Sequence, residues 1–300
     1  MRFLPSFLFG VWLICGTCAA RDIYVNNLAG DDRFDGALER GTDRYNGPVR
    51  TIAKAMRLAQ PGDVVRIANT GAPYREMISV AGGDHCGTPG RPFRIEGNGA
   101  VLDGSVAIPP LAWEHFQRDV FRFRPQRLGY QQLFLEDRPL VRRTVPEGSS
   151  RPETFNPLEW YFHGGYIYFR VEAVRLIDDY SLSHAGHPVG VTLYKVHDVV
   201  VSDLVVQGFQ LDGVNAHEGV RNGAIVGLIC RGNGRSGITV AGTSRLEIEA
   251  CVSGDNGFAQ LLTDGLSKTQ LAGTQLVANS APAIVRQGGE VRVVEPATEQ

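Results

Sequence analysis

The stretch of sequence that decides the fold is a run of three consecutive 23-residue segments: GAIVGLICRGNGRSGITVAGTSR (223–245), LEIEACVSGDNGFAQLLTDGLSK (246–268) and TQLAGTQLVANSAPAIVRQGGEV (269–291). Each segment carries short apolar runs separated by Gly, Asn, Asp and Ser. An asparagine and a large apolar residue return at the same place in every segment: Asn233, Asn256 and Asn279, and Ile225, Ile248 and Leu271. A fixed period of this length indicates a repeat architecture.

The repeats contain too much glycine, and their apolar runs are too short, for helices. A coil of ~22 residues with three short strands fits them, and successive coils then stack at the ~4.8 Å spacing of neighbouring strands. Asn233, Asn256 and Asn279 should form a ladder at a turn, because asparagine tolerates left-handed backbone and its amide can bond to the coils above and below. We interpret this ladder as structural, and we predict a parallel β-helix for residues 186–300 with Ile225, Ile248 and Leu271 in one core.

The residues before the repeats divide into two further parts. Residues 21–105 begin with the strand Ile23 to Val25 and contain an expected helix, Thr51 to Gln60, which would cap the first coils because repeat proteins expose apolar ends. Residues 106–185 are rich in aromatic side chains and alternate as antiparallel strands do, which predicts an inserted β subdomain. We expect Trp160 and Tyr161 to form an exposed pair that stacks on sugar rings; the alternative is that these aromatics form the core of the subdomain.

Residues 1–20 have the pattern of a signal peptide, with Arg2, an apolar run from Phe7 to Cys15, and small residues up to Ala20. The run is too short for a membrane span, which needs ~20 apolar residues. We therefore expect a secreted or periplasmic protein without a membrane anchor. A formal net charge of −2 and the lack of a basic stripe argue against nucleic acid as a partner. The three remaining cysteines, an odd number, argue against a disulfide framework: Cys86, Cys230 and Cys251.

The N-terminal block also carries an ordered set of motifs: Tyr-Val (24–25), a Gly/Asp-rich loop (26–36), Pro-Val-Arg-Thr-Ile (48–52), Pro-Gly-Asp-Val-Val (61–65) and Pro-Tyr-Arg-Glu (73–76). This order resembles secreted right-handed parallel β-helix proteins of the pectate-lyase-like superfamily, over residues 21 to about 104, and the later repeats agree with it. The resemblance implies a right-handed short solenoid, export and a polysaccharide or glycan as partner. It leaves the activity open, because the superfamily includes lyases, hydrolases, epimerases and proteins without known catalysis.

A polysaccharide lyase on this scaffold removes the proton α to a uronate carboxylate, which requires a cation, a base and a proton donor. Candidates in matching phase on neighbouring coils are Asp212, His217, Glu218 and Arg235, with Lys268 further on. Arg235 would neutralise the carboxylate, alone or beside Ca²⁺ held by Asp212 and Glu218. His217 or Lys268 would carry the proton. For each of these residues the alternative is a solvated loop position.

Three functions therefore stand at this point. The first is an exported carbohydrate-active enzyme, by resemblance a lyase that acts on acidic (uronate) polysaccharide by β-elimination. The second is a non-catalytic glycan-binding or surface-structural β-helix protein, and the third is an inactive relative. An enzyme should gather acids and a Lys or Arg in one groove, whereas a binding protein should expose aromatic side chains without that cluster.

Overall fold

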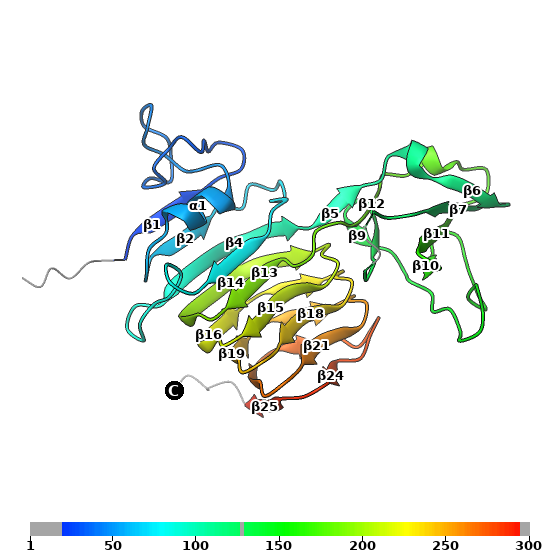
Figure 1. Cartoon of the computed structure of the whole chain (residues 1–300). Helices are drawn as coiled ribbons and strands as arrows, with labels where there is room; N and C mark the ends of the chain where they lie inside the picture. The colour runs from blue at the N-terminus through cyan, green and yellow to red at the C-terminus, as the bar shows by residue number, and fades with distance from the viewer. Residues whose placement is uncertain (1–19, 127–128, 295–300) are drawn as a thin grey trace, which may run out of the picture.

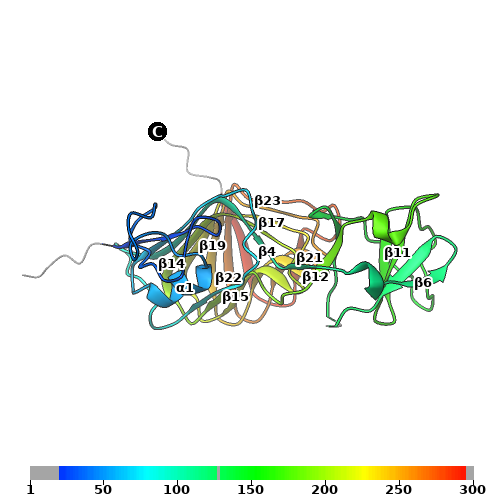
Figure 2. The same cartoon turned by 90° about the horizontal axis from the view of Figure 1, so that it is seen from above.

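The structure, a computed structural model, describes residues 20–126 and 129–294. The expected signal peptide thus lies outside the described residues except for Ala20. No helix within the described ranges is long and apolar enough to cross a membrane. Figure 1 shows a stack of parallel strands with the N-terminal block at one end and a second lobe projecting to the side, and Figure 2 shows the same lobe standing clear of the stack.

The stack is a parallel β-helix built on two sheets. The larger sheet has 11 strands in the described part of the chain, all of them paired in parallel. Its main path runs through β1 (Asp22–Val25), β2 (Val64–Ile67), β4 (Phe93–Asp103), β14 (His197–Gln207), β16 (Arg221–Val226), β19 (Arg245–Glu249), β22 (Lys268–Ala272) and β25 (Glu290–Val294), with β17 (Ile229–Arg231), β20 (Val252–Gly254) and β23 (Gln275–Leu276) beside it. The second sheet contains β3 (Ile78–Ala81), β13 (Val191–Tyr194), β15 (Asp212–Glu218), β18 (Ser236–Val240), β21 (Ala259–Thr263) and β24 (Ile284–Arg286).

The predicted core register is confirmed. Ile225 lies beside Ile248 and Ile248 beside Leu271, one residue in each of three neighbouring strands. All three side chains are buried in one apolar cluster that runs through the helix. The period of the sequence therefore equals one coil of the solenoid, and the predicted fold class is confirmed.

The asparagine ladder forms on two coils and changes on the third. The Asn256 side-chain oxygen accepts from the backbone N–H of Asn233 at 2.9 Å, and the Asn233 oxygen accepts from the N–H of Phe209 at 3.2 Å. Asn279 is exposed and accepts instead from the N–H of Asp255 at 2.9 Å. The ladder thus satisfies backbone donors at a buried turn, and it shifts by one residue where the stack meets solvent.

The expected capping helix is α1 (Ile52–Leu58). Thr51 is its N-cap, because its hydroxyl accepts from the N–H of Lys54 at 3.1 Å. Ile52, Ala55 and Met56 are buried against the first coils, and the helix contacts β1 and β2. The helix therefore covers the apolar end of the solenoid, as the sequence predicts.

The insertion consists of two antiparallel four-stranded sheets. β5 (Ser105–Ala107) leaves the coils and pairs with β12 (Leu182–Ala185), which returns to them, and β8 (Leu133–Leu135) and β9 (Arg138–Pro139) complete the first sheet. The outer sheet comprises β6 (Glu114–Gln117), β7 (Val120–Phe123), β10 (Trp160–His163) and β11 (Tyr166–Arg170), and two short 3₁₀ helices lie at Pro110–Ala112 and Ile177–Asp179.

The predicted exposed pair of aromatic residues is wrong. Trp160 is 0% exposed and Tyr161 4%. As neighbours on strand β10 they point to opposite faces, and both faces are covered: Trp160 packs in the insertion core and donates its indole N–H to the carbonyl of Leu140, while Tyr161 stacks on Tyr168 with ring centroids 4.5 Å apart. These rings form the core of the subdomain and cannot present a platform to a sugar.

Candidate functional site

Two of the predicted site residues meet. Arg235 donates from Nε and Nη2 to the two carboxylate oxygens of Asp212, at 2.9 and 2.6 Å. The same carboxylate accepts from the Asn215 amide at 2.7 Å and from the Ser236 hydroxyl at 2.9 Å, and it is fully buried. Asp212 therefore fixes Arg235, whose side chain remains 25% exposed. With its oxygens occupied by four donors, Asp212 is poorly suited to bind a calcium ion.

The other predicted residues lie elsewhere, so the single groove proposed for them is wrong. Glu218 ends β15, six residues after Asp212, which puts the two Cα atoms about 20 Å apart. Glu218 accepts from the backbone and hydroxyl of Thr243, and the exposed His217 lies beside Tyr194 with ring centroids 5.9 Å apart. Within the described ranges no three His, Cys, Asp or Glu side chains are grouped so that they could hold a metal ion.

Lys268 lies in the other sheet of the helix. It begins β22 of the larger sheet, and its ammonium group is 3.6 Å from the Glu290 carboxylate. Asp212 and Arg235 are neighbours because the repeat places them at equivalent positions of adjacent coils, as their spacing predicts. The repeat spacing does not make neighbours of residues at opposite ends of a strand or on different sheets.

A better-formed site lies where the insertion overhangs the coil turns. We call it the corner groove: a depression of about 620 Å³ between residues 139–145 of the insertion and turns 255–258 and 279–280 of the coils. This volume is in the range of small-ligand sites, ~300–1,000 Å³. Its polar and aromatic lining includes Tyr130, Gln132, Arg142, Phe162, Asp255, Asn256, Phe258 and Asn279.

One wall of the corner groove is aromatic. Tyr130 is 40% exposed, and its ring centroid lies 6.2 Å from that of Phe258. The Tyr130 backbone approaches Gly234 so closely that a Cβ there would stand 3.0 Å from Tyr130 Cβ. Because Gly234 has no side chain, the insertion can approach the coil turn closely. This approach places the exposed ring of Tyr130 beside the coil.

Arg142 supplies the cation of the corner groove. Its guanidinium lies 5.4 Å from the centroid of the buried Trp160 ring, and no described residue forms a hydrogen bond or ion pair with its side chain. Although the residue as a whole is exposed, desolvation lowers the pKa of its guanidinium. Arg143 differs: it forms an ion pair with Glu159 and lowers the pKa of that carboxyl to about 2, so its charge is compensated.

Further polar groups complete the lining. The Asp255 carboxylate accepts from the Asn279 amide at 2.8 Å and is exposed. Gln132 is 4% exposed, and its side-chain oxygen is buried without a hydrogen-bond partner in the described structure. The corner groove therefore offers an aromatic surface, an uncompensated cation and several hydrogen-bonding groups within one depression.

A second groove, of about 660 Å³, lies where β5 and β12 join the coils. Its cation, Arg75, lies 3.7 Å from the buried Asp103 carboxylate and 3.8 Å from that of Asp137, and it donates to the Ser105 carbonyl at 3.0 Å. The charge of Arg75 is thus already matched by acids of the protein. For an anionic ligand the corner groove is the better candidate.

Tyr130 and Arg142 are not among the site residues predicted from the sequence. Both belong to the insertion, more than 100 residues before the coil turns that they face, so no period relates them to the repeats. The one sequence signal for Arg142 is the tandem Arg142-Arg143, and it is weak. In the structure only Arg143 forms an ion pair with a carboxylate.

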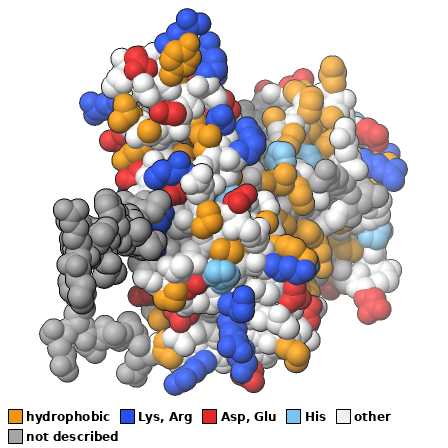
Figure 3. Space-filling view, turned by 60° about the vertical axis from the view of Figure 1, so that its left-hand side comes forward, with side chains coloured by type: hydrophobic (Ala, Val, Ile, Leu, Met, Phe, Trp, Pro, Cys, Tyr) orange, Lys and Arg blue, Asp and Glu red, His pale blue; other side chains and the backbone are white. Residues whose placement is uncertain are grey.

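The Figure 3 view shows basic and acidic side chains interspersed over one face of the molecule. Cys86, Cys230 and Cys251 are free and buried, and burial raises the pKa of the Cys251 thiol to about 11, so these side chains act as apolar filling of the core.

No protein-family model matches the chain, and no curated protein matches its sequence. Among solved structures, one described as a glycoside hydrolase is similar to it, with a TM-score of 0.59 and 10% identity over 85% of this chain and 73% of that one. A structure of XylC in complex with xylose gives a TM-score of 0.44 at 12% identity, over 91% of this chain and 70% of that one. A rhamnogalacturonan lyase gives 0.30 at 12% identity, over 85% and 68%. The match to the glycoside hydrolase supports the β-helix fold, and at 10% identity it concerns the fold alone.

Proposed function

We propose that this chain is a carbohydrate-active protein that binds an acidic, uronate-containing glycan in the corner groove. The observation that carries this proposal is Arg142, a cation without a carboxylate partner among the described residues, in a depression lined by the exposed ring of Tyr130 and the partly exposed ring of Phe258. A ligand that brings its own carboxylate would complete a charge-assisted pair there.

The rest of the groove suits a sugar. The apolar C–H face of a pyranose ring can lie on Tyr130 and Phe258, as amphipathic ligands do on aromatic walls. Asp255 and Asn279 offer acceptors and donors to ring hydroxyls. Arg235 lies within electrostatic range of Tyr130, but the buried Asp212 carboxylate already compensates its charge, so Arg142 is the cation that remains for an acidic sugar.

Binding is the primary proposal, and β-elimination is the second candidate. The observation that favours elimination is the presence of Arg142 and the Tyr130 hydroxyl in the same groove. Arg142 would neutralise the uronate carboxylate and thereby acidify the α-proton, and Tyr130 in its phenolate form would accept that proton from C5. The Tyr130 phenol formed in this step would return the proton to the leaving glycosidic oxygen as the C4–O bond breaks and the C4–C5 double bond forms.

Calorimetric titration with uronate oligosaccharides and with neutral oligosaccharides of equal length tests the proposal. Arg142→Ala should weaken uronate binding by a factor of roughly 10–100, the value of a charge-assisted hydrogen bond. Arg245→Ala is the matched control, because it removes the same charge from the larger sheet outside the corner groove. Equal losses in the two variants, or equal affinity of the parent for neutral sugars, would refute the site. Incubation with the same polymers and detection of the unsaturated product by ultraviolet absorbance tests elimination separately.

Calcium enters this experiment as a separate arm. Because the Asp212 carboxylate is occupied and Glu218 lies far from it, we expect Arg142, and not an ion held by these acids, to neutralise the ligand. Titrations with added Ca²⁺ and with a chelator should then agree. A large loss of affinity in chelator would show that an ion takes part.

We also propose that the protein is exported to the periplasm or the medium and loses residues 1–20. The support is the pattern of Arg2, the apolar run and the small residues before Arg21. Mass spectrometry of the protein recovered outside the cytoplasm should find Arg21 as the first residue. A full-length mass would refute processing.

A further inference from the structure

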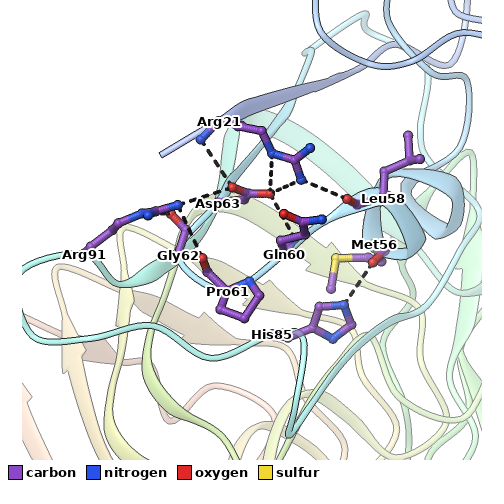
Figure 4. A network of polar contacts seen from close by, with 9 residues as sticks. All are labelled: Arg21, Met56, Leu58, Gln60, Pro61, Gly62, Asp63, His85 and Arg91. Atoms are coloured by element: carbon purple, nitrogen blue, oxygen red, sulfur yellow. Dashed lines mark hydrogen bonds and ion pairs between the residues drawn. The ribbon is translucent and has the colours of Figure 1, made fainter. Parts of the chain in front are cut away.

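The carboxylate of Asp63 lies at the point where β1, α1 and the first coil meet, and it is almost completely buried at 1% exposure. Figure 4 shows the groups that converge on it. Its Oδ2 atom accepts from Nη2 of Arg21 at 2.6 Å, from Nε of Arg21 at 3.2 Å and from the backbone N–H of Gln60 at 2.9 Å. This oxygen is well supplied with donors.

The second oxygen of Asp63 has weaker partners. Oδ1 accepts from the backbone N–H of Arg21 at 3.3 Å and lies 3.7 Å from Nη2 of Arg91. A carboxylate oxygen accepts two hydrogen bonds readily, and shorter ones when the donor is charged. The backbone nitrogen of Arg21 is therefore in place, but as a peptide N–H it provides a single uncharged donor.

Arg21 is held by its neighbours as well. Its carbonyl accepts from the N–H of Val64 at 2.9 Å, which begins the β1–β2 pairing, and its guanidinium donates to the carbonyl of Leu58 at the end of α1. Ala20, by contrast, is exposed. Within residues 20–126, Arg21 is thus the first residue that bonds to the coils, and it is the residue that the sequence predicts to be first after processing.

We propose that Asp63 is the binding site for the α-ammonium group that processing creates on Arg21. The inference rests on the proposed cleavage after Ala20. Hydrolysis of the Ala20–Arg21 peptide bond consumes one water molecule and leaves a carboxylate on Ala20 and an amine on Arg21, which takes up a proton below its pKa. The new ammonium lies at the place of the present N–H and brings a positive charge and additional donors to Oδ1 of Asp63.

The consequence is that the cap reaches its final stability only in the processed chain. One buried carboxylate then joins the start of β1, the C-terminal end of α1 through Gln60, and the loop that carries Arg91. The charged groups that face Asp63 are the guanidiniums of Arg21 and Arg91. Asp22 is paired with Arg66 at 2.9 Å, and the His85 ring lies 3.0 Å from the carbonyl of Met56.

The test compares two chains that differ by one residue: one that starts at Arg21 and one that starts at Ala20, each made by cleavage of a removable N-terminal fusion. At pH 7 the chain that starts at Arg21 should have a melting temperature higher by about 2–4 °C, as expected for one added ion pair in a protein of this size. An ammonium group bound to a carboxylate stabilises the fold below its unfolded pKa, ~8 for an α-amine, and the effect is lost as pH rises through the higher folded value. The difference should therefore vanish near pH 10.

A chemical readout separates this ion pair from a general effect of chain length. Acylation of the α-amine by a mild amine reagent should be about tenfold slower in the chain that starts at Arg21 than in the chain that starts at Ala20, because a bound ammonium must first lose its proton and leave Asp63. Asp63→Asn in the chain that starts at Arg21 should restore the faster rate. Equal melting temperatures and equal acylation rates in the two parent chains would overturn the proposal, even if the Asp63→Asn variant does not fold. A different N-terminus in the exported protein would refute the cleavage site alone.

Discussion

The substitution Asn256→Ala measures what the asparagine ladder contributes to stability. Asn256 is fully buried and makes five hydrogen bonds: it accepts two from Asn233, and it donates to the carbonyl of Cys230, the hydroxyl of Ser253 and the side-chain oxygen of Gln260 at 2.7–3.2 Å. Alanine would leave at least the N–H of Asn233 and the side-chain oxygen of Gln260 buried without the partner that Asn256 provides. At ~1–3 kcal/mol for each orphaned group, the free energy of unfolding should fall by about 3–5 kcal/mol.

The matched control is Asn279→Ala, the same substitution one coil further along. Asn279 is exposed, and among the described residues its side chain bonds only to Asp255, so water can replace these bonds and the loss should be about 1 kcal/mol or less. Urea denaturation followed by circular dichroism gives both values. If the two variants lose the same stability, the buried asparagine contributes no more than the exposed one. The argument from buried donors would then be wrong.

Two further predictions concern packing and pH. Met56→Asp should lower the melting temperature and solubility because it places a charge in the buried side of α1, whereas Ala53→Asp on the exposed side of the helix should melt like the parent; a parent-like melting curve for Met56→Asp would show that the helix is no cap. Burial lowers the pKa of His184 to about 4, so its neutral form is favoured in the folded state, and stability should be complete above pH ~6.5 and fall by roughly 3 kcal/mol at most as pH drops toward 4. His184→Gln should flatten that part of the stability–pH curve measured by urea denaturation, and an unchanged slope would contradict the assignment.

The fold could be predicted from the sequence because one period controls every level of it. A 23-residue step that returns both an asparagine and an apolar residue fixes the length of a coil, its turn and its inward face at once. The exception, Asn279, departs where the stack ends, and no pattern within the repeat marks that end.

The site could be predicted only in part. The repeat spacing correctly predicted that Asp212 and Arg235 are neighbours, because equivalent positions on adjacent coils lie side by side. The same rule was extended to Glu218, although a seven-residue strand separates its ends by about 20 Å. For Trp160 and Tyr161, alternation shows that the two rings face opposite ways but not that both faces are covered. The corner groove depends on how the insertion folds over the coil turns, which is tertiary information.

The pairing of β5 with β12 has a consequence for the order in which the molecule assembles. Ile248 joins Ile225 from 23 residues away, whereas Val201 must find Ile95 across 106 residues, and closing the longer loop costs about 1.3 kcal/mol more in chain entropy. The coils after residue 186 can therefore form early from local contacts, as low-contact-order structures do. Once the insertion has folded, the β5–β12 pair brings residues 105 and 185 together and shortens the effective loop between Ile95 and Val201 to about 26 residues, close to the length of one coil. We therefore expect folding of the insertion to precede the docking of β4 on β14 and to limit its rate. The N-terminal coils then join the stack.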